Sequence, residues 1–403
     1  MTDGGLSHVE AVFVQFGDFA EAAQRFAQGG QETYYAQRYS VEAVEALADV
    51  CKSVTVVCLG AQPASDVALS SGVRVVNLGF DLSEKRNPAR LCAALRGVGG
   101  THWIVRVVST PVLKAGLAAG VRVLPLWADS FRKASLLDGS WLRQRALAKL
   151  LQQDALPWIA NHNLAATRDL ERLGVDPGKL LPWDWPPQRR PTDYSPRTAP
   201  DPSSPRRLLY AGALALDKGI NDLIRAAALL KQQGRDVRVT IAGPGEPQDF
   251  TDCAVQQGVS DRVELLGRVP HSRVLEEMRR SDAVVVPIWH SYPEGLPMVI
   301  YDALCTRTPL LISDHPMFLA RLRAGDDALV FAGQNPTALA ERAAELFDRP
   351  DLFARLSENT AEAWARIQCP LKWGALVERW LADGPDDRRY LGEHSLATGR
   401  YEP

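Results

Sequence analysis

Residues 281–308 read SDAVVVPIWHSYPEGLPMVIYDALCTRT, and this stretch decides the fold of the second half of the chain. The apolar run at 283–287 has the length of a buried strand. The Pro-Glu-Gly sequence at 293–295 is typical of a turn, and Pro297 suits the first turn of a helix, where the backbone N–H groups lack partners. We therefore predict a strand, a turn and a helix N-terminus, an arrangement that can bind an anion.

Two carboxylates flank this predicted helix start. Glu294 precedes the helix and Asp302 lies on it, eight positions later. At a rise of ~1.5 Å per residue, they lie several ångströms apart, which is roughly the length of a diphosphate bridge. One carboxylate could bind sugar hydroxyls and the other ribose hydroxyls, with phosphates between them. The spacing taken alone favours an ordinary βα turn with two solvated acids.

The sequence Glu294-Gly295-Leu296-Pro297 with a second acid at 302 resembles a known signature. It is similar to the Glu-x7-Glu motif of retaining, nucleotide-sugar-dependent glycosyltransferases of the GT-B fold, particularly glycosyltransferase family 4. The second acid is Asp here, where the family usually has Glu. The resemblance implies that Glu294 holds sugar hydroxyls and that Asp302 holds the ribose.

The first turn of the second half, YAGALALDKG at 210–219, also resembles the family. In the family, a Gly-Arg pair and a later Lys contact the donor phosphates at this turn. Lys218 matches that Lys, but Ala213 occupies the Arg position, so Arg268 in VELLGRVP is a candidate replacement. The resemblance therefore implies catalytic roles for Glu294 and Lys218, within a donor site formed by Gly212, Lys218, Arg268, Glu294, Gly295, Leu296 and Asp302.

Length and composition set the broad class. A chain of 403 residues with 46% hydrophobic residues suits two domains, each with its own core. The net charge of −2, from 46 basic and 48 acidic residues, gives no basic excess for nucleic-acid binding. The first ten residues lack the pattern of a signal peptide, and no apolar run is long enough to span a bilayer. We expect a cytoplasmic protein, with peripheral membrane contact possible.

The cysteine and histidine patterns predict neither a metal site nor a disulfide framework. The six cysteines contain no CxxC pair, and the histidines form no metal-ligand spacing. We expect neither a metal nor a cofactor, because GT-B enzymes generally replace the metal with basic residues and a helix dipole. The nucleoside diphosphate sugar that the resemblance implies would be a substrate and not a cofactor.

The first half alternates short apolar strands with helical patterns, which predicts a doubly wound parallel sheet in a domain spanning 1–185. Helices are expected at 41–48, after a Ser40 cap, and at 164–173. The strands are expected at 12–16, 54–59, 73–78, 103–108, 121–126 and 158–160.

The composition changes near residue 186. The segment 186–206 is rich in proline and poor in apolar residues, so it indicates an interdomain linker. A second Rossmann-like domain follows at 207–370, and the resemblance implies that the two domains face each other across a cleft. A helix at 371–384 resembles the one that crosses back to the first domain in GT-B enzymes. Residues 385–403 are expected to form a frayed polar tail.

Candidates for acceptor binding come from the first half. Gly29-Gly30, between the first strand and the first predicted helix, resembles the family's glycine-rich loop, although a plain flexible loop fits as well. By position, Asp129 and His162 match cleft residues of the family, with Asp129 a catalytic candidate. The alternative is that each is a surface or strand-end polar group. Arg106 lies in an apolar strand, where a buried Arg needs an anionic partner.

The sequence as a whole predicts a hexosyltransferase. It would move a hexosyl group from a nucleoside diphosphate sugar to an acceptor hydroxyl of a glycan, a lipid-linked molecule or a small molecule, with retention of configuration. An inverting GT-B transferase or a nucleotide-sugar epimerase could use the same two domains. A catalytically inactive nucleotide-sugar-binding subunit is a third possibility, given Ala213 and Asp302.

Overall fold

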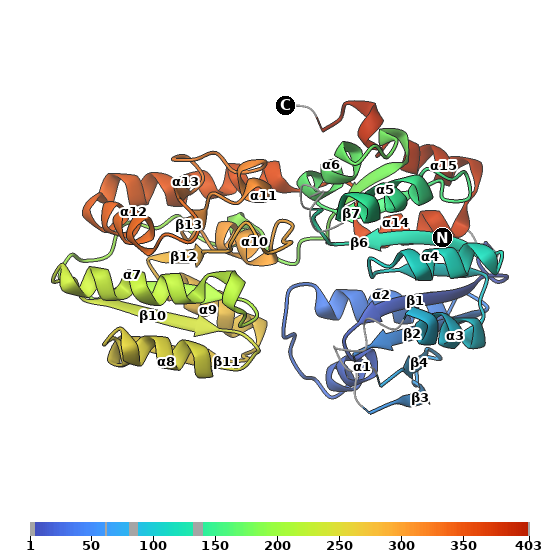
Figure 1. Cartoon of the computed structure of the whole chain (residues 1–403), viewed down its shortest axis with the longest axis horizontal. Coiled ribbons are helices and arrows are strands. Elements are labelled where there is room, and N and C mark those ends of the chain that lie inside the picture. The colour runs from blue at the N-terminus through green and yellow to red at the C-terminus, as the bar shows by residue number, and fades with distance from the viewer. Residues whose placement is uncertain (1–4, 61–62, 80–87, 132–139, 402–403) are drawn as a thin grey trace. The chain divides into compact units, whose positions relative to one another are not determined.

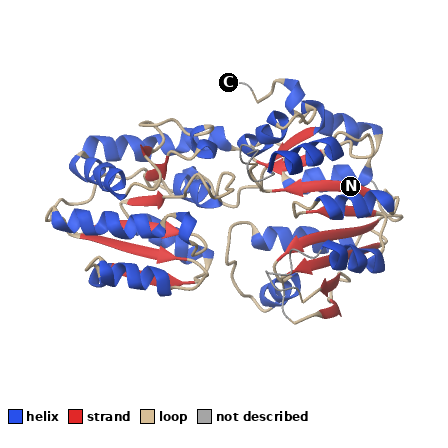
Figure 2. Cartoon of the chain, in the orientation of Figure 1, coloured by secondary structure: helices blue, strands red, loops and turns tan. Residues whose placement is uncertain are grey.

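The computed structural model describes residues 5–60, 63–79, 88–131 and 140–401. The chain forms two compact units, each with a parallel sheet flanked by helices (Figures 1 and 2). The N-unit comprises Met1–Gly30, Ala36–Pro186 and Cys369–Pro403, and the C-unit comprises Gln31–Tyr35 and Pro187–Gln368. Both units are Rossmann-like, as the alternation of strands and helices predicted.

The N-unit contains an eight-stranded sheet in the order β3-β4-β2-β1-β5-β6-β7-β8. Its pairs are parallel except for β3 with β4. The strands are β1 (Glu10–Phe16), β2 (Ser53–Leu59), β3 (Ser65–Ala68), β4 (Arg74–Asn77), β5 (His102–Val105), β6 (Arg122–Trp127), β7 (Ile159–His162) and β8 (Leu180–Trp183).

Both faces of this sheet are buried. Alternate residues of β1 belong to two separate cores, with Ala11 and Phe13 in one and Val12 and Val14 in the other. This explains the continuous apolar character of the strand. The helices of this part of the chain are α1 (Phe19–Ala27), α2 (Gln37–Ala48), α3 (Pro88–Val98), α4 (Thr110–Ala118), α5 (Ser140–Leu151) and α6 (Leu164–Arg172).

The end of the chain belongs to the N-unit. In α14 (Trp373–Ala382), Trp373 and Trp380 are buried in the core that contains Phe13. The expectation of a frayed tail was wrong for its described part, because α15 (Pro385–Gly392) buries Leu391 in the same core. Arg388 also pairs with Asp383 at 2.8 Å, and Leu396–Thr398 form a 3₁₀ turn.

The C-unit contains a six-stranded, wholly parallel sheet in the order β11-β10-β9-β12-β13-β14. The order reverses direction at β9, so the switch point of the fold lies between β9 and β12. The strands are β9 (Arg206–Ala211), β10 (Val237–Ala242), β11 (Val263–Gly267), β12 (Ala283–Val286), β13 (Leu310–Ser313) and β14 (Leu329–Phe331). The helices are α7 (Ile220–Gln232), α8 (Gln248–Gln256), α9 (His271–Arg280), α10 (Met298–Cys305), α11 (Pro316–Leu319), α12 (Pro336–Asp348) and α13 (Pro350–Ile367).

The proline-rich segment packs along the C-unit. Arg197 donates to the carbonyl oxygen of Ser281 at 2.6 Å, and Arg307 donates to that of Pro191 at 3.0 Å. A segment poor in apolar side chains is thus held on the C-unit largely by hydrogen bonds to backbone carbonyls. The composition had indicated only an interdomain linker.

Several local expectations need correction. The sequence pattern missed α1, the edge strand β3 and β8. The helix α2 begins at Gln37 after Ala36, whose φ of 59° is left-handed, so Ser40 lies within the helix and is not its cap. Pro297 is the N-cap of α10, one residue before the first turn.

Candidate active site

The loops that follow β9 and β12 meet at the carboxyl edge of the C-unit sheet, at the switch point. Gly219 has a φ of +74°, and a Cβ there would overlap the carbonyl of Pro287. The backbone N–H of Trp289 donates to the carbonyl oxygen of Asp217 at 3.0 Å. Only glycine allows this close approach, which brings together two segments about 70 residues apart in sequence. The edge at a switch point is where open α/β sheets bind ligands.

Lys218 and Glu294 form an ion pair across these two loops. Lys218 ends a 3₁₀ turn (Leu216–Lys218), and its Nζ contacts the Glu294 carboxylate. The same Nζ lies 4.1 Å from the centroid of the Tyr292 ring. The two side chains keep 12% and 19% of their surface exposed, so each charge is neutralised by its partner and still open to a ligand.

The loop that carries Glu294 is held from several sides. The indole Nε1 of Trp289 donates to Asp222 Oδ2 at 2.7 Å, and Ser313 Oγ donates to the carbonyl oxygen of Ile288 at 2.7 Å. Burial raises the pKa of Asp222 above its usual range, although the hydrogen bond from Trp289 opposes that shift. The position of Glu294 therefore depends on contacts from β13 and α7 as well as on the local turn.

Asp302 lies on α10 and is 6% exposed. Its Oδ2 is 2.8 Å from Nε2 of His271, the first residue of α9. Burial lowers the pKa of His271, but the charge and hydrogen bond of Asp302 and the charge of Glu32 outweigh it, so the pKa lies above its usual value. Sequence reasoning missed this partner, although its place after the strand-end loop VELLGRVP was a usable signal.

Glycine backbone forms the neighbouring part of the same edge. The N–H of Gly212 donates to the carbonyl of Ala242 at 2.9 Å, and the N–H of Gly243 donates to that of Gly267 at 2.8 Å. A Cβ at Gly243 would overlap the carbonyl of Gly212. With no side chains at these three positions, the backbone itself can approach a ligand.

The remaining predicted donor-site residues differ in exposure. Gly295 and Leu296 are buried, so Leu296 contributes its side chain to the core and only its backbone to the loop. Arg268 is exposed and makes no hydrogen bond or ion pair with the residues that the structure describes.

Gly29-Gly30 has a structural role that the sequence did not reveal. The pair follows α1, so it does not lie between the first strand and the first helix. The N–H of Gly29 donates to the carbonyl of Phe26 at 3.0 Å, and that of Gly30 donates to Arg25 at 2.8 Å, which is the Schellman pattern that ends a helix. Gly29 has a φ of +78°, and a Cβ at Gly30 would overlap Arg25.

Arg106 lies just beyond β5 and is half-buried. It donates to Gln15 Oε1 at 2.6 Å and to Ser40 Oγ at 3.4 Å. Its guanidinium also lies 5.7 Å from the ring of Trp185 and 5.8 Å from that of Trp373. Its contacts thus include an amide, a hydroxyl and two aromatic faces.

Asp129 follows β6 and is half-buried. Its backbone is fixed by Asn161, since its N–H donates to Asn161 Oδ1 at 3.2 Å and its carbonyl accepts from Asn161 Nδ2 at 2.8 Å. The strands β6 and β7 are neighbours, so Asp129 and His162 both lie at the carboxyl edge of the N-unit sheet.

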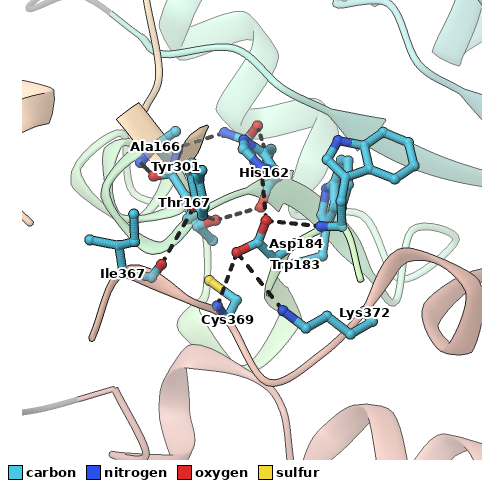
Figure 3. A network of polar contacts seen from close by, with 12 residues as sticks. His162, Ala166, Thr167, Trp183, Asp184, Tyr301, Ile367, Cys369 and Lys372 are labelled. Carbon is cyan, nitrogen blue, oxygen red and sulfur yellow. Dashed lines mark hydrogen bonds and ion pairs between the residues drawn. The ribbon is translucent and has the colours of Figure 1, made fainter. Parts of the chain in front are cut away.

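His162 belongs to a buried polar network (Figure 3). Its Nε2 is 3.2 Å from Asp184 Oδ1, and the histidine is only 6% exposed. Asp184 also accepts from the backbone N–H groups of Trp185 at 2.8 Å and Cys369 at 3.3 Å, and Lys372 Nζ lies 4.0 Å away. Burial lowers the pKa of Lys372. His162 thus helps to tie β7 and β8 to the chain that returns at Cys369, and it offers little surface to an acceptor.

The described residues form neither a metal site nor a membrane-spanning helix. Within them, no group of three or more His, Cys, Asp or Glu side chains is placed to hold a metal ion. None of the described helices combines the length and the apolar character that crossing a bilayer requires.

Comparisons with known proteins agree on the class of domain. Residues 195–363 match the family model described as Glycosyl transferases group 1. The alpha-D-kanosaminyltransferase of Streptomyces kanamyceticus is 31% identical over 155 residues, which cover 38% of this chain and 39% of that relative. The chain thus matches well under two thirds of the length of this relative.

Solved structures show the fold across nearly the whole chain. Sucrose-phosphate synthase from Thermosynechococcus elongatus superposes with a TM-score of 0.67 at 15% identity, covering 93% of this chain and 100% of that one. Anabaena HepE in complex with UDP-glucose gives 0.62 at 13% identity, covering 93% and 99%. Residues 195–363 of this chain therefore match the Glycosyl transferases group 1 model, and the chain has the two-domain fold of GT-B glycosyltransferases.

Proposed function

We propose that this protein transfers a hexosyl group from a nucleoside diphosphate sugar to an acceptor hydroxyl, with retention of configuration at the anomeric carbon. The observation that carries the proposal is the Lys218–Glu294 ion pair at the switch point of the C-unit. A cation for phosphate and a carboxylate for hydroxyls lie side by side there, on loops that a close glycine contact fixes.

The pair suggests how the donor is bound. The diphosphate takes Lys218 as its counter-ion, and the sugar hydroxyls donate to Glu294, so each charge exchanges one partner for another. Because the pair is partly exposed, neither charge has to be buried alone during this exchange. Asp302, held by His271, binds the ribose, and the N-terminus of α10 adds N–H groups near the phosphates. Gly212 and Gly295 let the backbone approach, and Arg268 supplies a second cation.

The chemistry needs electrostatic stabilisation at the leaving group. The bond from the anomeric carbon to the phosphate oxygen breaks and a bond to the acceptor oxygen forms on the same face, while the departing phosphate oxygen receives the acceptor proton. Negative charge grows on the diphosphate, so Lys218 stabilises the transition state more than the ground state. In this proposal the reaction uses no metal.

The comparisons support this choice of donor. The HepE structure, which shares the fold, contains UDP-glucose, and the Streptomyces relative is named as an alpha-D-kanosaminyltransferase. The acceptor is proposed to meet the carboxyl edge of the N-unit sheet, where Asp129 and Arg106 lie. Asp129 would contact the acceptor hydroxyl. Gly29-Gly30 and His162 are weaker candidates, because the first ends α1 and the second is buried.

Donor screening followed by product analysis tests the proposal. Thermal shifts with a panel of nucleoside diphosphate sugars identify the donor, because a ligand that binds the native state stabilises it. NMR of the product then gives its anomeric configuration. An inverted product or an epimerised donor would overturn the assignment. Donor binding with no transfer to any acceptor tested would instead favour an inactive binding subunit.

The variant Glu294→Ala sharpens this test. It should lose most transfer while free nucleoside diphosphate binds almost as in the wild type, because the proposed partners of Glu294 are hydroxyls of the hexose. Equal losses for both ligands would remove Glu294 from the sugar subsite.

A further inference from the structure

His315 connects the loop after β13 to the loop that carries Glu294. It is 4% exposed and serves as the N-cap of α11. Its Nδ1 accepts from the backbone N–H of Met317 at 3.3 Å, and its Nε2 lies 3.3 Å from the carbonyl oxygen of Tyr292. One imidazole therefore bridges two loops at the carboxyl edge of the sheet.

These two contacts define one neutral tautomer. Nδ1 faces an N–H and must accept, so the proton sits on Nε2 and is donated to the Tyr292 carbonyl. Burial lowers the pKa of His315, and the nearby charges of His290 and Lys218 act in the same direction, against the bond to Tyr292 and the charge of Asp314. The ring is thus neutral at physiological pH, in the form that satisfies both partners.

The position of the 289–295 loop depends on the carbonyl oxygen of Tyr292. It also accepts from the backbone N–H of Glu294 at 2.8 Å. The ring of the same tyrosine lies 4.1 Å from Lys218 Nζ. Tyr292 therefore touches both members of the Lys218–Glu294 pair, and a group that fixes its carbonyl also fixes the pair.

We propose that His315 is a positioning residue that holds the 289–295 loop, and with it Glu294 and the ring under Lys218, in the geometry required for sugar transfer. His315 touches no donor atom in this proposal and acts through Tyr292. The catalytic consequence rests on the proposed function, whereas the mechanical consequence, the fixing of the Tyr292 carbonyl by the His315 imidazole, does not.

A second role for His315 has to be separated from this one. As an N-cap it also stabilises α11, and losing any cap costs stability. His315→Asn distinguishes the two roles, because asparagine is a good N-cap but its short side chain cannot also reach the Tyr292 carbonyl. His315→Ala removes both contacts. His290→Ala is the matched control, since His290 is an exposed histidine on the same loop, paired with Asp314 at the surface.

Hydrogen exchange on the full-length protein without ligand tests the tether directly. Amides in 289–295 should exchange roughly tenfold faster in His315→Asn, because the loop opens locally, while protection in the β-strands of the C-unit stays as in the wild type. His290→Ala should leave the loop near wild-type protection. Unchanged exchange in His315→Asn, or an equal increase in His290→Ala, would overturn the proposal.

Kinetics tests the catalytic consequence, with the donor that the protein turns over. His315→Asn should lower kcat by roughly 10- to 100-fold, the scale of a small misplacement of a catalytic group, while the affinity for UDP, GDP or ADP, whichever binds, changes less than about twofold. A rise in KM at unchanged kcat would contradict positioning. If the protein turns over no donor, the proposed function is wrong. The hydrogen-exchange experiment would still show whether His315 holds the 289–295 loop.

Discussion

Asp184 in the N-unit and Glu294 in the C-unit are both carboxylates in segments that follow a parallel strand, and each has a lysine nearby. Asp184 is 1% exposed and is surrounded by two backbone N–H groups, His162 and Lys372, all within the N-unit (Figure 3). Glu294 keeps 19% of its side chain exposed and has one charged partner, Lys218.

The difference shows how two similar acids come to serve different purposes. A buried carboxylate bound by backbone amides from distant segments cannot change partners without breaking the fold, because each group left behind would be unsatisfied. A carboxylate paired with one flexible, partly exposed lysine can exchange that partner for a ligand. Asp184 therefore joins segments of the chain, whereas Glu294 is free of such a structural role and binds the donor in the proposed function.

The largest expected effect is on stability in the N-unit. Asp184→Ala should lower the free energy of unfolding by about 3–5 kcal/mol, because it leaves buried N–H groups and Lys372 without their acceptor. Urea denaturation measures this loss. The matched change Glu294→Ala should cost much less. If the two variants lose equal stability, the contrast between the sites is wrong.

The next effect is on catalysis in the C-unit. Lys218→Ala should lower kcat by roughly 10²- to 10³-fold with a smaller change in donor affinity, because Ala213 cannot share the charge on the leaving diphosphate. Lys218→Arg is not expected to restore the rate, since a planar guanidinium fills the pocket differently. Steady-state kinetics of each variant gives kcat and KM separately. A rise in KM alone would indicate uniform binding, and no change in either parameter would transfer the role to Arg268.

A smaller effect is expected for the nucleotide. Asp302→Asn should weaken binding of the free nucleoside diphosphate by about 1–2 kcal/mol, because a neutral amide replaces a charge-assisted acceptor for the ribose hydroxyls. Calorimetry gives the affinity. Asp282→Asn is the control, since Asp282 is another buried aspartate of the C-unit but lies at the amino end of β12. Equal affinity in Asp302→Asn and the wild type would place Asp302 outside the site.

The smallest effect concerns pH and His271. The pKa of His271 in the folded protein lies above its ordinary value, so the folded state binds the proton more tightly than the unfolded state does. The resulting stabilisation is complete below the ordinary histidine pKa of about 6.5 and is lost as the pH rises through the folded value. The stability difference between wild type and His271→Gln should therefore be larger at pH 6 than at pH 8. A difference that does not change with pH would contradict the Asp302–His271 pairing.

Much of the fold followed from local patterns. Continuous apolar runs bounded by turn residues predicted most of the strands of the N-unit sheet and β12 of the C-unit, since strands covered on both faces carry little else. The edge strand β3 and the short β8 were missed, because SDVA is polar and LLPW contains proline. The helix α1 was also missed, so Gly29-Gly30 was taken for a loop near a ligand when its left-handed backbone ends that helix.

The sequence by itself determined the strand, turn and helix around Glu294, because turn chemistry and periodicity act over a few residues, whereas Lys218 was marked only by the resemblance to the glycosyltransferase family. Only the tertiary structure decided which groups meet. Lys218 and Glu294 are 76 residues apart, and His162 lies 22 residues from Asp184. Asp302 and Tyr292 likewise contact His271 and His315, which follow β11 and β13 on opposite sides of the switch point. Such pairings arise from strand order and burial, which no local pattern specifies.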